Sequence, residues 1–480
     1  MLKFMNRVDM YQLEIVRKKT FGNNNNQFYH RRPKPVAQKS NSNNLAIEDS
    51  NLETEIALGK AENLESPSQN FGEEEEPIQP KKPYQVILLT EYRSGSTFTA
   101  ELFNKNPSAF YYFEPLWPIS PSTDKNLDTN KKLLETFNNY INDLLSCEIK
   151  DMKEIFPHGP GRDGRPGGHL AANCVDENFC WRSRHDRLRR EPFCPVDSNS
   201  KTEIPTFPER AALKKCGKID LNLAKKTCKD ESDLVVTKLI RYQQIKHAIT
   251  YYSNQQQLDI INTPKIIYVI RDPRAIAASR IALREGGWNE HNSDKLSKIC
   301  DEFHKNALFL RLNIEQINSY QFSSNNNFQS TFIKSRILVI RYEDLNQDQL
   351  QGFHQIYDFL DIPSSNLGYQ QVEKWVQSNI AKDRRKRDGI STAFGTKRDK
   401  KASLLSLSKW ARKLKYSTVK LIQDNCGLVF KEFGYQSLTE LEMLQLGNQL
   451  MSVDSEETNQ IQSFSDDCPL CQDLAKLGKL

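Results

Sequence analysis

The sequence predicts an α/β fold in which a central, mostly parallel sheet is flanked by helices and begins with a P-loop-like strand, loop and helix. Short apolar runs of strand length alternate with stretches of helical spacing, and the clearest runs are "VILLT" (86–90), "IIYVI" (266–270) and "ILVI" (337–340). This alternation is typical of parallel sheets. The runs are also almost continuously apolar, as expected for strands that helices cover on both faces.

Composition and charge exclude few classes of function. The chain has 480 residues, of which 38% are hydrophobic and 27% are charged, and its formal net charge is +6. That charge permits acidic partners without requiring them. No apolar run approaches the roughly 18 to 20 residues that cross a bilayer, and the N-terminus lacks the pattern of a secretory signal peptide. We therefore expect no transmembrane segment.

Changes in composition divide the chain into a tail, a domain and a second tail. Residues 1–83 are rich in Asn, Pro and charge and predict a disordered tail or stem. The alternating pattern then predicts a domain over 84–438. Within it, 156–232 begins with "FPHGPGRDGRPGGH" and predicts an irregular, Cys-rich insertion. Residues 439–480 predict an acidic C-terminal tail.

The cysteines leave two interpretations open. Five of the ten lie between Cys174 and Cys228, as in a disulfide-bonded subregion of a secreted enzyme, although reduced structural thiols explain them as well. Their spacings fit no zinc pattern, and Cys468 and Cys471 form a lone CxxC, which is half a metal site at best. We predict no metal.

The first candidate site is the loop in "LLTEYRSGSTFTAELF" (88–103). A tight turn between a buried strand and a helix N-terminus directs backbone N–H groups toward an anion. The groups expected to do so belong to Ser94, Gly95, Ser96, Thr97 and Phe98. The GxxxxGK[ST] pattern of nucleotide-hydrolysing loops is missing, and Arg93 supplies the positive charge instead. The alternative is a plain Ser/Gly turn that caps a helix.

A second candidate site follows the strand run at 266–270. Arg271 stands at the end of that strand, where open α/β sheets bind ligands, and Asp272 and Pro273 predict a helix start. Ser279 lies about two helical turns further on, on a face from which it reaches back toward Arg271. Taken alone, an arginine and a serine at this spacing are more typical of a structural role.

Taken together, these stretches resemble a known family. "RSGSTF", "FYYFEPLW" and "VIRDPRAIAASR" resemble motifs of Golgi carbohydrate sulfotransferases, of the galactose, N-acetylglucosamine and N-acetylgalactosamine 6-O-sulfotransferase family that includes keratan sulfate and chondroitin 6-sulfotransferases. The resemblance covers about 84–438 and continues in "VVTKLIR", "ILVIRYEDL", "FGTKR" and "SKWARKLKYSTVKLIQDNCGLVFKEFGY".

The resemblance implies a sulfotransferase fold and the donor 3′-phosphoadenosine 5′-phosphosulfate. Its 5′-phosphosulfate would be held by residues 93–98 and its 3′-phosphate by Arg271 and Ser279. The reaction implied is sulfuryl transfer to a sugar hydroxyl, at O-6 of Gal, GlcNAc or GalNAc, with Arg93 stabilising the transferring group. Glu114 in "YYFEPLW" is the candidate general base, and its alternative role is a helix cap or a salt bridge.

Further residues receive weaker expectations. Two roles are open for Lys238 and for Thr396, Lys397 and Arg398 of "FGTKR". They are expected either to complete the nucleotide site or to lie solvated at the surface. Glu343 and Asp344 are expected to fix a strand end by capping and ion pairing. Trp117 and Trp410 either lie near the acceptor or pack structurally.

The basic runs at 181–190 and 382–389 have two interpretations: a binding site for an anionic glycan, or solvated loops. Neither has the layout of a nucleic-acid site, so we expect a glycan acceptor and no nucleic acid.

The chain departs from the family in two respects. The N-terminal transmembrane anchor that the family carries is not visible, and no N-x-S/T sequon occurs apart from one with proline. The resemblance nevertheless implies a Golgi lumenal location. The alternatives are a sulfotransferase for a protein tyrosine or a lipid, and a catalytically silent relative that binds a nucleotide or a glycan. The sequence indicates no oligomeric state.

Overall fold

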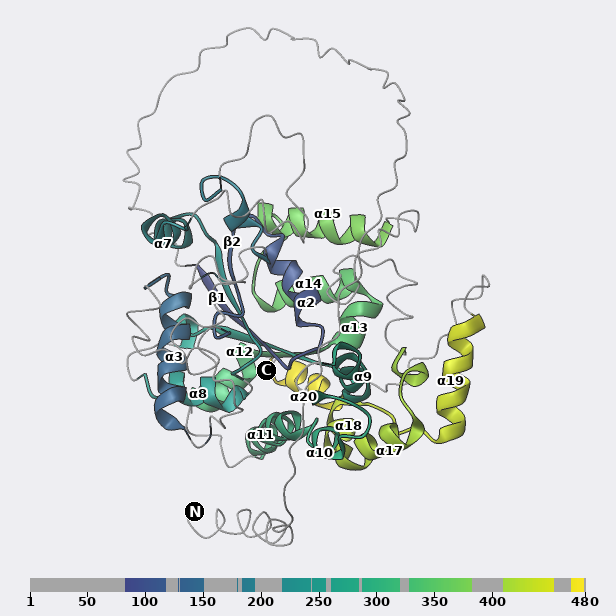
Figure 1. The fold of residues 1–480 in the computed structure, drawn as a ribbon. Helices are drawn as coiled ribbons and strands as arrows, with labels where there is room; N and C mark the ends of the chain where they lie inside the picture. Colours follow the sequence, from purple (N-terminus) through teal and green to yellow (C-terminus); the bar gives the residue numbers. More distant parts are fainter. Residues whose placement is uncertain are drawn as a thin grey trace, which may run out of the picture. The chain divides into compact units, whose positions relative to one another are not determined.

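Five parallel strands form the centre of the fold, in the order β2-β3-β1-β4-β5 (Figure 1). They are β1 (Tyr84–Thr90), β2 (Ala109–Phe113), β3 (Leu234–Leu239), β4 (Lys265–Ile270) and β5 (Ile337–Arg341). Every pairing between neighbours is parallel, which confirms the predicted α/β class. Since parallel strands end at one edge of a sheet, the loops after these five strands gather there.

The computed structural model describes part of the chain, all of it within the unit Glu75–Leu480. The described residues are 83–117, 128, 130–150, 179, 184–194, 218–242, 244–255, 260–284, 287–319, 328–381, 409–452 and 468–478. The predicted N-terminal tail, the basic run 382–389 and the "FGTKR" residues Thr396, Lys397 and Arg398 therefore lie outside the described residues.

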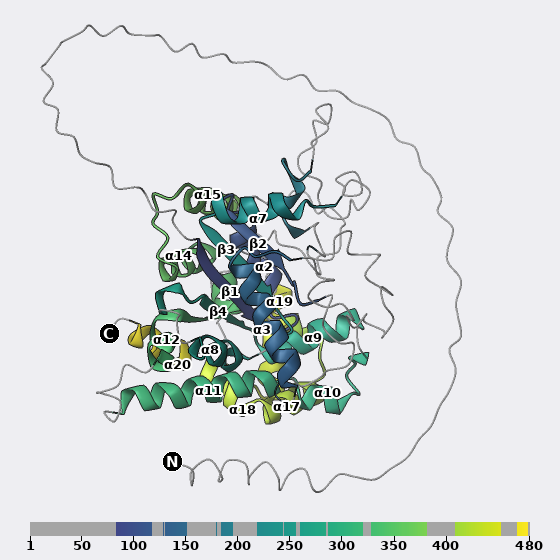
Figure 2. The same ribbon diagram turned by 90° about the vertical axis from the view of Figure 1, so that its left-hand side faces the viewer.

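Helices cover both faces of the sheet, which explains why the strands are apolar on both sides. One face carries α2 (Ser96–Asn104), α13 (Tyr342–Gln347), α14 (Gln349–Phe359) and α15 (Leu367–Ala381). The other carries α3 (Lys131–Leu145), α8 (Ile245–Ser253), α11 (Asp301–Asn318) and α12 (Phe328–Arg336), as Figures 1 and 2 show. Among the described helices, none is long and apolar enough to cross a membrane.

Helix α2 follows the sequence prediction closely. Phe98, Leu102 and Phe103 share one face, and all three are buried against the sheet and α14. Gly95 stands at the N-cap in the left-handed conformation, with φ of 88°. The helix therefore begins directly at the turn that the sequence predicted as an anion loop.

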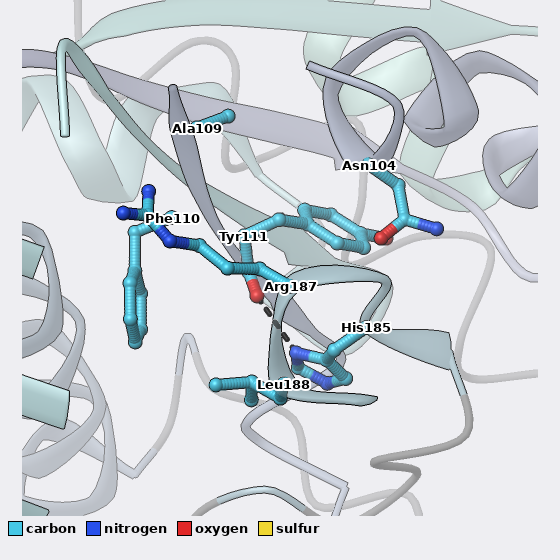
Figure 3. A pocket seen from close by; sticks show the side chains of 7 residues that line it. All are labelled: Asn104, Ala109, Phe110, Tyr111, His185, Arg187 and Leu188. Atoms are coloured by element: carbon cyan, nitrogen blue, oxygen red, sulfur yellow. Dashed lines mark hydrogen bonds between the residues drawn. The ribbon is translucent and has the colours of Figure 1, made fainter. Parts of the chain in front are cut away.

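The described part of the insertion is anchored to the edge strand β2. His185 shares a hydrogen bond through Nδ1 with the carbonyl oxygen of Tyr111 at 2.8 Å, and the Asp186 N–H donates to Oδ1 of Asn104 at 2.9 Å. Figure 3 shows the contact between His185 and Tyr111 in a small hollow that Arg187 and Leu188 also line. Three of its lining residues, His185, Arg187 and Leu188, belong to the basic run 181–190, and none of the residues predicted for the nucleotide site lines it. The insertion is also not irregular throughout, because it ends in helix α7 (Leu221–Asp230).

Disulfides join cysteines that the sequence did not pair. Three bonds join described cysteines to one another, Cys147–Cys228, Cys300–Cys426 and Cys468–Cys471, and Cys194 is also disulfide-bonded. None of the described cysteines is free, so the alternative of reduced thiols is wrong for them. The interpretation of Cys468 and Cys471 as half a metal site is also wrong, since they bond to each other. Cys228 pairs outside the predicted cluster because α7 lies beside the end of α3.

The C-terminal segment packs more extensively than the sequence predicted. It contains α17 (Tyr416–Asn425), α18 (Gly427–Phe433), α19 (Glu440–Ser452) and α20 (Pro469–Leu477), and the first two lie beside α9 (Pro273–Leu283), α10 (Ser293–Ser297) and α11. Helix α20 buries Leu470, Leu474 and Leu477 in the core and contacts β5. The prediction of a tail from residue 439 onward is therefore wrong for α20, whose leucines recur at helical spacing.

Candidate functional site

The loop after β1 is held by its own polar groups. The N–H of Ser94 donates to the carbonyl oxygen of Glu91 at 3.2 Å, and the Ser94 hydroxyl donates to the same oxygen at 2.6 Å. The N–H of Phe98 donates to the carbonyl oxygen of Gly95 at 2.9 Å. Two of the five N–H groups predicted to face an anion are therefore engaged elsewhere, because the turn needs them to close.

The remaining part of the loop keeps the character of an anion site. Within the described residues, no hydrogen bond engages the N–H groups of Gly95, Ser96 and Thr97. They stand at the first turn of α2, where the positive end of the helix dipole adds to their attraction for an anion. Arg93 has a positive φ of 74°, so the chain turns sharply directly before these donors.

An aromatic ring under the loop explains why position 95 is glycine. A Cβ atom there would lie 2.0 Å from Cδ2 of Tyr342, the first residue of α13. The guanidinium carbon of Arg271 lies 4.7 Å from the centroid of the same ring. The ring of Phe98 meets it edge-on, with 5.9 Å between the two centroids. Tyr342 thus contacts both the loop and Arg271, and it was not among the predicted site residues.

Both predicted anion-binding segments meet in the structure. Arg93 donates through Nε to the hydroxyl of Ser279 at 2.9 Å, and Arg271 donates through Nη1 to the carbonyl oxygen of Arg93 at 3.0 Å. Asp272 caps α9 by accepting from the N–H of Arg274 at 2.8 Å, and Pro273 is the first helical residue, as predicted. The edge of the sheet therefore brings Arg93, Arg271 and Ser279 together across more than a third of the chain's length.

Glu91 and Arg280 support the loop from behind, and sequence reasoning missed both. Arg280 donates from Nη2 to the carbonyl oxygen of Tyr92 at 2.8 Å, approaches Oε2 of Glu91 at 3.5 Å and stacks on Trp288. Burial raises the pKa of Glu91 to about 7, although the charge of Arg280 opposes this. An acidic residue just before the loop and an arginine just after Ser279 were the available signals.

Glu343 fixes the turn that carries Arg271. Its Oε1 accepts from the N–H of Asp272 at 3.1 Å, and its Oε2 accepts from the hydroxyl of Tyr435 at 3.0 Å. Burial, with the nearby charge of Asp272, raises the pKa of Glu343 to about 7. Asp344 pairs with Arg341 at 2.7 Å. Both acids thus have the structural roles at the strand end that the sequence indicated.

Glu114 takes part in a buried ion-pair cluster. Its Oε1 lies 2.9 Å from Nζ of Lys238, and its Oε2 lies 3.0 Å from Nη1 of Arg241. Burial alone would raise the pKa of Glu114, but the charges and hydrogen bonds of Lys238 and Arg241 outweigh it and lower the pKa below its ordinary value. The salt-bridge alternative is therefore present in the structure, and the carboxylate also stands at the edge where the strands end.

Lys238 joins this cluster to the anion loop. Its side chain is only 1% exposed, and its Nζ donates to the hydroxyl of Thr97 at 3.2 Å as well as to Glu114. The ring centroid of Phe113 lies 3.9 Å from the same nitrogen. The alternative of a solvated surface lysine is therefore wrong. Arg184, from the basic run in the insertion, approaches the same Phe113 ring with its guanidinium carbon at 5.9 Å.

The two predicted tryptophans, Trp117 and Trp410, both make contacts within the protein. Trp410 is buried and packs on the guanidinium of Arg274 at 4.3 Å, so it anchors the C-terminal segment. The N–H of Trp117 donates to the carbonyl oxygen of Glu114 at 2.9 Å. In the described ranges, no group of three or more His, Cys, Asp or Glu side chains has the arrangement of a metal site.

The sequence has clear relatives. Residues 83–434 match the family described as the sulfotransferase domain. Carbohydrate sulfotransferase 3 of Mus musculus is 28% identical over 362 residues, which cover 73% of this chain and 68% of that protein. Carbohydrate sulfotransferase 1 of Danio rerio is 24% identical over 380 residues, which cover 75% of this chain and 79% of that protein.

Two solved structures also match, but weakly. Sulfotransferase STF9 from Mycobacterium avium has 13% identity and a TM-score of 0.28, with 74% of this chain and 78% of that chain covered. A sulfotransferase domain from the curacin biosynthetic pathway has 16% identity and a TM-score of 0.28, with 72% and 97% covered.

Proposed function

The chain belongs to the sulfotransferase domain family, and we propose that it transfers the sulfuryl group of 3′-phosphoadenosine 5′-phosphosulfate to a sugar hydroxyl of a glycan. Its relatives include carbohydrate sulfotransferases 1 and 3, whose names indicate the acceptor class. The motifs that resemble the 6-O-sulfotransferases favour O-6 of Gal, GlcNAc or GalNAc as the acceptor position.

One observation carries the proposed donor site. Arg93, Ser279 and Arg271 form a continuous set of contacts between the loop after β1 and the turn after β4. The donor has an anion at each end of its nucleoside, so it needs two cationic sites held at a fixed separation. The N–H groups of Gly95, Ser96 and Thr97 would receive the 5′-phosphosulfate, and Arg271 with Ser279 would receive the 3′-phosphate.

The proposed reaction is a displacement at sulfur. The oxygen of the acceptor hydroxyl forms a bond to sulfur while the bond between sulfur and the bridging oxygen of the donor breaks, and the nucleotide leaves with the bonding electron pair. Arg93, Lys238 and the loop N–H groups stabilise the charge on that bridging oxygen. Glu114 accepts the proton of the hydroxyl.

The disulfides support a lumenal location. Bonds such as Cys147–Cys228 and Cys300–Cys426 form and persist in oxidising compartments and are rare in the cytosol. Together with the resemblance to Golgi enzymes, they favour the secretory pathway, where the donor and the glycan acceptors meet.

Thermal unfolding with and without 3′-phosphoadenosine 5′-phosphate tests the donor site. We expect a rise in melting temperature for the wild type that is lost in Arg271→Ala and retained in the control Arg190→Ala, an exposed arginine of the insertion. An unchanged melting temperature in the wild type would overturn both the carbohydrate proposal and a sulfotransferase of another acceptor class.

Transfer of labelled sulfate to a panel of acceptors tests the acceptor class. The panel contains desulfated keratan, chondroitin and a tyrosine peptide, and we expect label on a glycan. Label on the peptide would instead favour the protein tyrosine alternative. Binding of the donor without label on any acceptor would favour a catalytically silent relative.

A further inference from the structure

Lys238 lies between the carboxylate of Glu114 and the loop proposed to bind the 5′-phosphosulfate of the donor. It projects from the end of β3 toward α2, and its Nζ contacts the Thr97 hydroxyl, Oε1 of Glu114 and the face of Phe113. The side chain is almost fully enclosed, so no bulk water screens its charge. The contact with Thr97 places this ammonium group at the loop where the 5′-phosphosulfate of the proposed donor would lie.

In this arrangement Glu114 is a poor base. Each of its oxygens accepts a hydrogen bond from a cation, and the cluster holds the carboxylate in its charged form. A group that accepts a proton from an alcohol during the reaction needs the opposite environment. One of the two cations therefore has to withdraw before Glu114 is an effective base.

Lys238 is the cation that is able to move. It is a point charge on a flexible stem and already donates to the loop, whereas Arg241 lies on the other side of the carboxylate and is 26% exposed. A phosphosulfate bound at Gly95, Ser96 and Thr97 offers oxygens that compete for the same ammonium group.

We propose that Lys238 transfers its hydrogen bond from Glu114 to the 5′-phosphosulfate when the donor binds, so that Glu114 becomes an effective base only in the donor-loaded enzyme. This inference rests on the proposed function. Burial lowers the pKa of Lys238, and its pairing with Glu114 opposes this effect. The exchange moves a hydrogen bond of Lys238 and not a proton, and no covalent bond changes until the acceptor hydroxyl attacks sulfur and gives its proton to Glu114. The exchange makes productive binding of the acceptor follow that of the donor.

The other charged and titratable groups around Glu114 do not replace this role. Arg241 follows β3, Arg184 comes from the insertion, and Tyr111 comes from β2. Burial raises the pKa of Tyr111 well above its ordinary value, so it stays neutral. The exchange leaves Arg184 and Arg241 in place, so their attraction for the carboxylate is the same in both states of the enzyme.

Proton uptake on donor binding tests the proposal. Calorimetric titration with 3′-phosphoadenosine 5′-phosphosulfate, without acceptor and in buffers of different ionisation enthalpy, gives the number of protons taken up per donor bound. At mildly acidic pH we expect the wild type to take up more protons per donor bound than Glu114→Gln, because the carboxylate that Lys238 leaves is more readily protonated. The titration of the nucleotide itself cancels in this difference, because the ligand is the same.

Two lysine variants make the assignment specific. In Lys238→Met the cation is already missing, so we expect the extra proton uptake to disappear even if Glu114→Gln does not fold. Lys105→Met is the matched control, because Lys105 pairs with Glu101 and Asp186 at the far end of α2. It should keep the proton uptake of the wild type.

The outcomes separate the two proposals. Donor binding with equal proton uptake in the wild type, Glu114→Gln and Lys238→Met would overturn the exchange at Lys238 and leave the proposed function intact. A wild type that binds no donor at all would overturn the proposed function itself.

Discussion

The candidate site has two halves in which charge is balanced differently. In the donor half, residues 91–98 with 271–280, Arg93 donates to a serine hydroxyl and Arg271 donates to a backbone carbonyl. In the transfer half, which consists of Glu114, Lys238 and Arg241, both cations donate to a carboxylate. Glu91, in the donor half, and Glu343, next to it, have pKa values raised to about 7, whereas the pKa of Glu114 is lowered.

The two halves are prepared for an anion in different ways. A guanidinium that donates to neutral oxygens exchanges them for a phosphate without breaking an ion pair, and neighbouring carboxyls that protonate near pH 7 add little repulsion. A cation bound to a carboxylate in a buried site has to exchange one negative partner for another. The donor half is thus ready to bind, whereas the transfer half changes its pairing on binding.

The largest expected effect comes from removing the charge of Glu114. Glu114→Gln keeps the shape of the side chain but accepts no proton, so we expect turnover to fall by roughly 10²- to 10⁴-fold. The donor half is unchanged, and 3′-phosphoadenosine 5′-phosphate should still raise the melting temperature. Labelled sulfate transfer and thermal unfolding measure the two effects, and full activity of the variant would remove Glu114 from the mechanism.

The next effect, in the donor half, comes from removing the guanidinium of Arg93. Arg93→Ala loses a preorganised donor at the transferring group, so we expect transfer to fall by roughly 10²- to 10³-fold. It also releases Ser279, so nucleotide binding should weaken in this variant, unlike in Glu114→Gln. Steady-state rates and nucleotide titration measure both effects, with Lys105→Met, at the far end of α2, as the control. A variant with normal affinity for the nucleotide would contradict the assignment of Arg93 to the donor half.

The pH dependence of stability distinguishes the halves by sign. Glu343 has its pKa raised from 4.5 to about 7, so it favours the folded state below pH 4.5, and this stabilisation disappears as pH rises to 7. The loss amounts to roughly 3 kcal/mol in the free energy of unfolding. Denaturant unfolding of the wild type and Glu343→Gln between pH 4.5 and 7.5 measures the difference.

Glu114 provides the opposite case in the same experiment. Its lowered pKa means that its charged form stabilises the folded state above about pH 4.5, and that this contribution disappears as pH falls. The difference in free energy of unfolding between the wild type and Glu114→Gln should therefore rise with pH. The corresponding difference between the wild type and Glu343→Gln should fall. If both differences in free energy of unfolding changed with pH in the same direction, the pKa values of Glu114 and Glu343 would not be shifted in opposite directions.

Much of the fold and of the donor half could be predicted because the signals are local. The strand runs, the turn around Gly95, and Asp272 with Pro273 at a helix start each occupy a few consecutive residues. The rule that parallel strands end at one edge then brings Arg93 near Arg271, although 178 positions separate them.

What could not be predicted depends on pairing between side chains from distant elements. Nothing in "VVTKLIR" reveals that Lys238 is enclosed by Phe113, Thr97 and Glu114, because lysines in sequence look solvated. Arg184 was one of several arginines in a basic run, and the structure uses its neighbours Arg187 and Arg189 to pair with Glu231 and Asp186.

The smallest expected effect concerns Arg241, whose removal leaves Lys238 in place. Arg241 lowers the pKa of Glu114, so Arg241→Gln should raise it and move the acidic limb of the pH profile for sulfate transfer to higher pH. The rate near pH 7 should change only a few-fold, because Arg241 is partly solvated. Transfer rates from pH 4.5 to 8 measure the shift, with Lys105→Met as the control. An acidic limb that moves to lower pH would contradict the ion pair between Arg241 and Glu114 as a determinant of the base.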